Sequence, residues 1–182
     1  MKWVGITGSI GTGKSTVSTI IRNLGYPVLD ADKIAQEQLK KNSVGYEEIV
    51  KIFGSGILDS ENEIEREKLA AKVFGSPEML KKLENIVHPL VQKEVEEQKE
   101  KLAQQGLQVA FYDVPLLFEK KLQDRFDEII LVACDPQKQI ERIRKRNKWS
   151  DEEIQKRVQS QIPLGDKIKM SRHIISVSYT HL

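Results

Sequence analysis

A glycine-rich loop near the amino terminus constrains the fold of this chain more than any other feature. Residues 8–15 read Gly-Ser-Ile-Gly-Thr-Gly-Lys-Ser and match the pattern G-x-x-x-x-G-K-[ST] in full. The apolar run 3–7 before the loop predicts a strand, and residues 16–24 after it have helical spacing. A chance glycine-rich turn would not carry both neighbours, so the segment indicates a P-loop nucleotide-binding fold.

The residue types in this loop suit a bound polyphosphate. Its glycines let successive N–H groups turn inward, and the helix that follows adds the positive end of its dipole. Lys14 can reach the β- and γ-phosphates, while the Ser15 hydroxyl can join the coordination shell of Mg²⁺. By itself the loop does not separate a kinase from a GTPase or an ATPase. Nucleotide contacts are expected at Gly8, Gly11, Thr12, Gly13, Lys14, Ser15 and Thr16.

The rest of the chain predicts one domain built around a sheet. A length of 182 residues falls within the usual range for a single domain. Further apolar runs at 26–29, 107–112 and 128–133, and a weaker one at 173–177, show little polar alternation, as in parallel strands covered on both faces. Charged helical segments separate these runs. We predict an α/β P-loop NTPase fold with a five-stranded parallel sheet flanked by helices.

Two helical excursions leave this predicted core. Residues 31–105 are too many for a simple crossover, so we interpret them as a helical insertion. Residues 136–171 contain two basic helices, the second capped by Ser150, and this arrangement is typical of a lid. The breaks in the insertion are expected at Gly54-Ser55-Gly56, Gly75-Ser76-Pro77 and His88-Pro89. The core of the single domain 1–182 then consists of residues 1–30, 106–135 and 172–182.

Basic side chains crowd the predicted lid: Arg142, Arg144, Lys145, Arg146, Lys148 and Arg157. Kinases close such an arm to bring arginines onto the transferred phosphoryl group and to exclude water. Arg142 and Arg146 are four residues apart and share one helix face. Acidic residues lie among these bases, and a mixed-charge helix is usually a solvated surface. We therefore expect only one or two of them to act, and we assign a catalytic role to Arg142.

Carboxylates follow two of the predicted strands. Asp30-Ala31-Asp32 comes after the second strand, and the carboxyl ends of parallel strands are where open α/β sheets bind ligands. A kinase acting on an alcohol needs a carboxylate that accepts the hydroxyl proton, and Asp32 is the candidate, ahead of Asp30. An equally supported alternative is that one of them caps a helix over 33–41. Asp113 ends the third strand and is expected to hold Mg²⁺ through water, the alternative being a solvated strand end.

Composition and missing motifs narrow the function. The formal net charge of +2 gives no basic excess for nucleic acid, and Cys134, the single cysteine, cannot form an intramolecular disulfide and is expected to be buried. Residues 147–150 depart from the guanine-reading pattern N-K-x-D, and the D-x-x-G pattern of GTPase switches is absent after Asp113. No apolar stretch reaches the length of a signal-peptide core or a membrane span. We expect a cytoplasmic monomer that acts on small molecules.

Taken in order, the motifs of this chain resemble those of the dephospho-coenzyme A kinase family through about Ile175. The loop is generic, whereas the Asp-Ala-Asp, His-Pro-Leu and Val-Pro-Leu-Leu-Phe-Glu segments in this order are much more specific. The resemblance rests on the loop from Gly5, Asp30-Ala31-Asp32, His88-Pro89-Leu90, Asp113-Val114-Pro115-Leu116-Leu117-Phe118-Glu119, Arg142, Arg146, Arg157 and Gln161-Ile162-Pro163-Leu164.

This resemblance implies phosphorylation of the ribose 3′-hydroxyl of dephospho-coenzyme A by ATP with Mg²⁺, the last step of coenzyme A synthesis. Asp32 would be the base, His88 would belong to an acceptor-binding insertion, and Pro115 and Leu116 would help to form the acceptor pocket. Taken alone, a histidine before proline is more often a hydrogen-bonded helix-end residue than a ligand. The alternatives are another small-molecule kinase, such as a nucleoside monophosphate kinase, and a nucleotide-binding module without transfer chemistry.

The sequence departs from the family after Ile175. The resemblance implies a strand ending in an Asp-Asn-x-Gly-like turn near the adenine and then a helix, but residues 176–182 read Ser-Val-Ser-Tyr-Thr-His-Leu. We interpret this segment as a truncated or spliced tail. It is expected to alter the adenine contacts and to leave apolar surface on one sheet face uncovered, at ~25 cal/mol for each Å².

Overall fold

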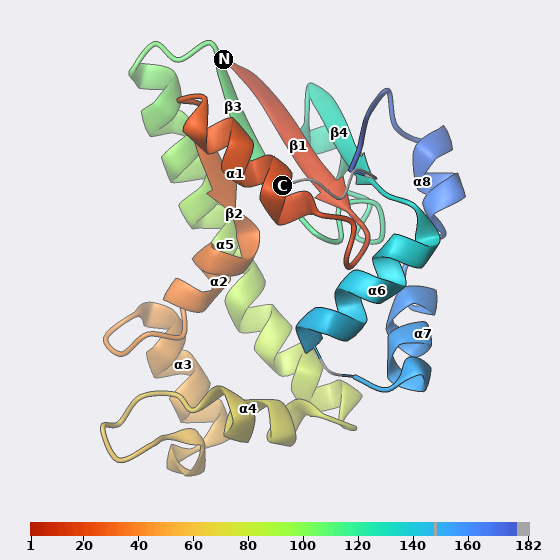
Figure 1. Ribbon diagram of the computed structural model, residues 1–182. Coiled ribbons are helices and arrows are strands. Elements are labelled where there is room, and N and C mark those ends of the chain that lie inside the picture. The colour runs from red at the N-terminus through yellow and green to blue at the C-terminus, as the bar shows by residue number, and fades with distance from the viewer. Residues whose placement is uncertain (148, 178–182) are drawn as a thin grey trace. The chain divides into compact units, whose positions relative to one another are not determined.

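A parallel sheet of five strands forms the centre of the structure, a computed structural model that describes residues 1–147 and 149–177 (Figure 1). The strands are β1 (Lys2–Gly8), β2 (Val28–Asp30), β3 (Val109–Asp113), β4 (Glu128–Ala133) and β5 (His173–Ser176), in the order β2-β3-β1-β4-β5. Every neighbouring pair is parallel. The predicted fold class is confirmed, and the five apolar runs of the sequence supply the five strands.

The register of the strands brings acidic residues to one edge of the sheet. Asp113 at the end of β3 lies opposite Ile6 of β1 on one side and Asp30 of β2 on the other. Because the strands are parallel, the segment after Gly8 leaves the sheet at this same carboxyl edge. The glycine-rich loop therefore begins at the edge where these two aspartates end their strands.

The chain separates into two compact units. The first comprises residues 1–30 and 103–182 and the second comprises residues 31–102. Helices of the first unit are α1 (Lys14–Asn23), α6 (Pro136–Asn147), α7 (Asp151–Gln159), α8 (Leu164–Lys169) and the 3₁₀ turn η2 (Gln123–Arg125). The second unit contains α2 (Ala31–Glu37), α3 (Val44–Phe53), the 3₁₀ turn η1 (Ser55–Ile57) and α4 (Arg66–Val73). Helix α5 (Pro77–Gln104) begins in the second unit and ends in the first.

Apolar side chains pack on both faces of the sheet. On one face, Val17 and Ile21 of α1 contact Ile6 and Val132. On the other face, the segment after β3 supplies the core, since Val114, Leu117 and Phe118 pack against Leu131. The second unit has a separate core of Ile49, Phe53, Ile57, Leu69 and Ile86. Burial on both faces explains why the strands read as apolar runs without alternation.

One predicted break in the helical insertion is wrong. Helix α5 continues through Pro89, although this proline has no N–H to donate to the preceding turn. Ile86 before the proline and Leu90 after it both pack in the core of the second unit, and this burial holds the helix on both sides of the lost hydrogen bond. The other two breaks are confirmed, because Gly54 and Gly75 follow α3 and α4 with φ of 76° and 77°.

Helix boundaries also differ from the sequence-based ones. Helix α1 begins at Lys14 rather than at residue 16, so its first turn lies inside the loop. Helix α2 begins at Ala31 and ends at Glu37, which leaves Asp32 within the first turn rather than before it. Helix α7 starts where expected, and Ser150 forms a capping box with Glu153.

Cys134 lies directly after β4 and is buried, as its apolar setting predicts. Burial raises the pKa of the thiol, an effect that the nearby Arg142 only partly opposes. At neutral pH the native protein is therefore expected to react with a small thiol reagent at least about tenfold more slowly than the urea-unfolded chain. Absorbance of the released chromophore measures both rates, and equal rates would contradict the burial.

The β5 edge of the sheet is open among the described residues. Ile174 is 46% exposed and Ile175 is 39% exposed, and they line a recess of about 490 Å³ together with Val4, Phe111 and Ile130. Exposed apolar surface was expected on one sheet face, and this recess is such a surface. The predicted changes at residues 178–182, like the predicted role of Lys148, lie outside the described residues. No described helix is long and apolar enough to cross a membrane.

Candidate active site

The glycine-rich loop connects β1 directly to α1. Gly13 is the N-cap of α1 and has φ of 93°, a conformation that L-side chains rarely adopt. A Cβ atom on Gly8 would lie 2.7 Å from the Thr12 hydroxyl oxygen and 2.7 Å from the Val132 carbonyl oxygen, so there is no space for a side chain. The shape of the loop therefore depends on glycine at both ends.

Internal hydrogen bonds close the loop on one side. The Thr12 side chain is fully buried, and its hydroxyl donates to the Ser9 carbonyl oxygen at 2.8 Å, as its amide does at 3.2 Å. The first N–H groups of a helix have no intrahelical acceptor. The N–H groups at the start of α1 are therefore available to bind a ligand. The side chains of Ser15 and Thr16 in that first turn lie at the surface. This arrangement is an anion site at a helix N-terminus.

Lys14 forms an ion pair with Asp113 beneath the loop. The other oxygen of Asp113 accepts a hydrogen bond of 2.6 Å from the Ser18 hydroxyl, and Asp113 is only 3% exposed. The alternative of a solvated strand-end aspartate is therefore wrong. Sequence reasoning missed Ser18, although its position four residues after Lys14 places both side chains on the same face of α1.

The oxygens at this place are of the kind that suits hard cations such as Mg²⁺, Ca²⁺ or Mn²⁺. Ser15 and Asp113 offer hard oxygen donors, and Asp113 lies against the face of α1 that begins with Lys14. No group of three or more His, Cys, Asp or Glu side chains suited to a metal occurs among residues 1–147 and 149–177. Mg²⁺ usually needs only one or two protein ligands because phosphates and water complete its shell.

Arg142 of α6 lies against the loop. Its guanidinium donates to the Thr12 carbonyl oxygen at 3.3 Å and to the Val177 carbonyl oxygen at 2.9 Å. The described contacts of Arg144 and Arg157 stay within residues 136–171, the predicted lid. Arg144 pairs with Asp151 at 2.7 Å, and Arg157 stacks on Trp149 with 4.0 Å between the guanidinium carbon and the ring centre. Among these three arginines, Arg142 has contacts that link it to the nucleotide loop.

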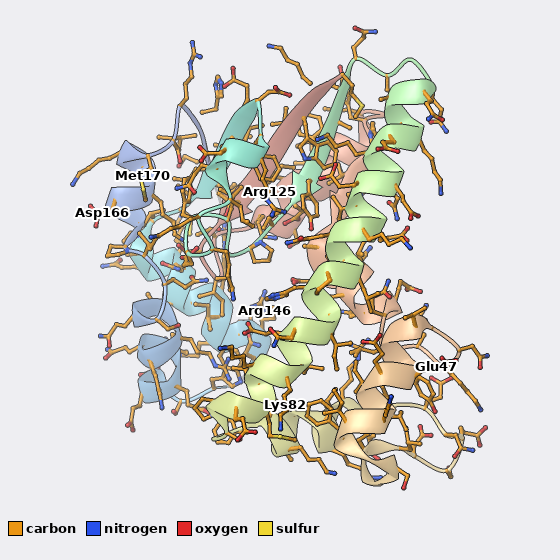
Figure 2. All side chains as sticks on the ribbon, turned by 180° about the vertical axis from the view of Figure 1, so that it is seen from behind. Glu47, Lys82, Arg125, Arg146, Asp166 and Met170 are labelled. Carbon is orange, nitrogen blue, oxygen red and sulfur yellow. The ribbon has the colours of Figure 1, made fainter. Side chains whose placement is uncertain are left out.

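Arg146 does not share this position, although it was predicted on the same helix face as Arg142. Its Nε atom donates to the side-chain oxygen of the adjacent Asn147 at 2.8 Å. Figure 2 labels it near the carboxyl end of α6. Although Arg142 and Arg146 lie on the same face of α6, the described contacts bring only Arg142 to the loop.

The two aspartates after β2 have different surroundings. Asp30 is the last residue of β2, and its carboxylate lies 3.7 Å from the Arg22 guanidinium. Asp32 lies in the first turn of α2 and belongs to the second unit. Because α2 starts at Ala31, Asp32 lies inside this helix and is not its N-cap. The alternative in which Asp32 only caps the helix is therefore excluded.

The predicted acceptor residues lie in both units. In the first unit, the Pro115 carbonyl oxygen accepts a hydrogen bond of 3.3 Å from the Thr7 hydroxyl, and Leu116 is exposed beside the buried Leu117. An exposed leucine on a segment fixed by Leu117 and Phe118 is available to a ligand. In the second unit, His88 is half exposed on α5 and lies 3.9 Å from Glu84.

Sequence reasoning assigned no role to four polar residues that hold the outer side of the loop or its supports. They come from segments more than 100 residues after the loop, and although Glu119 and Gln161 stand in segments that carry the family resemblance, nothing in the sequence pairs any of the four with the loop. Gln139 is 5% exposed and donates to the Ile10 carbonyl oxygen at 2.7 Å. The complete set is Glu119, Gln139, Gln161 and Lys167.

Known proteins resemble this chain along almost its whole length. The family model described as dephospho-CoA kinase matches residues 2–180. A dephospho-CoA kinase of Bdellovibrio bacteriovorus is 44% identical over 175 residues, which cover 96% of this chain and 87% of that protein. A crystal structure of a Thermus thermophilus protein has a TM-score of 0.84 and 35% identity, over 98% of this chain and 90% of that one.

The structure of a dephospho-CoA kinase from Campylobacter jejuni has a TM-score of 0.73 and 32% identity, over 98% of this chain and 89% of that chain. A shikimate kinase from Acinetobacter baumannii, at 12% identity and a TM-score of 0.51, shares the fold alone. Since the family match spans the nucleotide loop, the Asp113 segment and the lid together, this chain belongs to the dephospho-CoA kinase family.

Proposed function

We propose that this enzyme transfers the γ-phosphoryl group of ATP to the ribose 3′-hydroxyl of dephospho-coenzyme A, giving coenzyme A and ADP. The observation that carries the proposal is a complete phosphate loop at the carboxyl edge of the sheet, with Lys14 bound to the buried Asp113 beneath it. The family match over residues 2–180 supports the choice of acceptor. The substrates are small molecules, and we expect a monomer that acts in the cytoplasm.

The residues around the nucleotide would act by positioning its phosphates and by stabilising the charge that develops on them during transfer. The amides at the start of α1 would bind the phosphates, and Lys14 would move from Asp113 to the β- and γ-phosphate oxygens as charge develops there. Mg²⁺, held by the Ser15 hydroxyl and by Asp113 through water, would neutralise phosphate charge when bound. Arg142, which already contacts the loop through the Thr12 carbonyl, would bind the same phosphates.

Asp32 is proposed to orient the acceptor hydroxyl and accept its proton. It comes two residues after Asp30, which lies opposite Asp113 in the sheet register. That spacing limits the distance between the Cα atoms of Asp30 and Asp32 to about 7 Å, by the reach of an extended chain. Leu116 and Pro115, on the segment after Asp113, would contact the acceptor, and His88 of α5 is also proposed as an acceptor-binding residue.

Mass spectrometry of a reaction with ATP, Mg²⁺ and dephospho-coenzyme A tests the function directly. We expect coenzyme A and ADP in equal amounts, with no product when Mg²⁺ is chelated. A nucleoside monophosphate serves as the competing acceptor, because a nucleoside monophosphate kinase is the alternative assignment drawn from the sequence. Faster turnover of the nucleoside monophosphate than of dephospho-coenzyme A would overturn the assignment of the acceptor.

A further inference from the structure

A buried ion pair lies outside the phosphate loop and is not explained by nucleotide chemistry. Lys167 of α8 is fully buried, and its Nζ atom lies 2.7 Å from Oε1 of Glu119, on the segment after β3. The same nitrogen donates to the Ser9 hydroxyl of the loop at 3.3 Å. Asp166, the preceding residue, is exposed on the outer side of α8, where Figure 2 labels it with Met170. Lys167 therefore points inward from a short surface helix.

The pair also fixes the segment before α8. Oε1 of Glu119 accepts the Ile162 amide at 3.1 Å, and the adjacent Gln161 accepts the Ile10 amide of the loop at 2.9 Å. Gln139 donates to the carbonyl oxygen of the same Ile10 at 2.7 Å. The Ile10 peptide is thus held by side chains on its outer side, and its N–H group does not face the anion site. Two neighbouring loop residues, Ser9 and Ile10, depend on this network.

Stability alone is a weak reason to bury such a pair. Removing two charges from water is unfavourable, and replacing a buried ion pair by apolar residues is often neutral or stabilising. Here one oxygen of Glu119, Oε2, is also buried without a hydrogen-bond partner among the described atoms. An arrangement that is unfavourable in this way but touches the nucleotide loop at two residues indicates a role in the geometry of the loop.

We propose that Lys167 and Glu119 are positioning residues for the phosphate loop. Lys167 fixes the Ser9 hydroxyl, and Glu119 fixes the segment whose Gln161 turns the Ile10 amide outward. Together they keep the first half of the loop in the open form that accepts a polyphosphate. The proposal rests on ATP as the phosphoryl donor, but it concerns nucleotide binding and not the identity of the acceptor.

The variants Lys167→Met and Lys167→Met/Glu119→Gln separate positioning from stability. The single variant leaves a buried carboxylate without its cation and is expected to lower the melting temperature. The double variant removes both charges, while the amide oxygen introduced at position 119 can still accept the Ile162 N–H group, so its melting temperature is expected to return toward that of the wild type. Both variants lack the bond to Ser9, and both should bind ATP about tenfold more weakly, as expected for a lost hydrogen bond to a charged group.

Calorimetric titration with ATP in the absence of acceptor gives the affinity, at a temperature well below the melting point of every variant. Ser9→Ala removes the same bond from the loop side and should weaken ATP binding by a similar factor. Lys169→Met, on the same helix but at the surface, is the matched control and should bind ATP like the wild type. ATP affinity in the double variant within twofold of the wild type would overturn the proposal, even if the single variant unfolds. A wild-type enzyme that binds ATP but ignores dephospho-coenzyme A would refute only the proposed acceptor.

Discussion

Replacing Lys14 with alanine is expected to lower kcat for phosphoryl transfer by about 10²–10³-fold, the usual effect of removing one donor to developing transition-state charge. Lys14 is the one side-chain cation within the loop sequence 8–15. It is the first residue of α1, and its ion pair with Asp113 holds its ammonium group beneath the loop. Coupled measurement of ADP release at saturating ATP and acceptor gives the rate. A rate within threefold of the wild type would contradict the assigned role.

The same substitution leaves Asp113 buried with only the Ser18 hydroxyl as a described partner, so stability should also fall. Removing one member of a buried ion pair destabilises a protein by about 3–5 kcal/mol. The double variant Lys14→Ala/Asp113→Asn removes the stranded charge and should recover part of the melting temperature without recovering turnover. Lys2→Ala, at the exposed start of β1, is the control for loss of a lysine and should change neither quantity.

Asp32→Asn is expected to reduce kcat by about 10²–10⁴-fold, the range for loss of a general base, while ATP affinity stays within twofold of the wild type. The amide keeps the size of the carboxylate but cannot accept the proton of the acceptor hydroxyl. Stopped reactions analysed for coenzyme A give kcat, and calorimetry gives the ATP affinity. The same two measurements test the alternative of a nucleotide-binding module without transfer chemistry, because the wild-type form of such a protein would produce no coenzyme A.

Asp30→Asn is the matched control for this experiment. Asp30 lies two residues earlier and has the Arg22 guanidinium 3.7 Å away, so its main effect should be on local stability. Unchanged turnover in Asp32→Asn would remove Asp32 from the mechanism. A larger loss in Asp30→Asn than in Asp32→Asn would transfer the role of base to Asp30.

Much of the sheet could be predicted from the sequence because each of its central strands is covered on both faces. Ile6, Leu131 and Val132 are fully buried, so their strands read as apolar runs that no surface helix would have. The position of Asp113 follows from the end of one such run. Its partner Lys14 could be expected nearby, since both lie at the carboxyl edge, but the buried bond to Ser18 required the orientation of α1.

Other features depend on contacts that no local pattern contains. Pro89 predicts a helix break because it has no N–H group to donate. Only the packing of Ile86 and Leu90 explains why α5 continues through it. Lys167 reads as one more charge on a surface helix, because nothing in its neighbours in sequence indicates a partner at Glu119 or Ser9. Whether a charged side chain is buried depends on tertiary contacts between segments that are distant in the sequence.

The strand order has a consequence for the synthesis of the protein on the ribosome. β1 emerges first, yet it pairs with β3 and β4, whose first residues lie more than 100 positions later. The guanidinium of Arg142 then links Thr12 to Val177, the last described residue. Nucleotide therefore cannot stabilise the nascent chain until nearly all of these partners have left the exit tunnel. Such late pairing slows folding and leaves β1 exposed to aggregation until β3 and β4 have emerged.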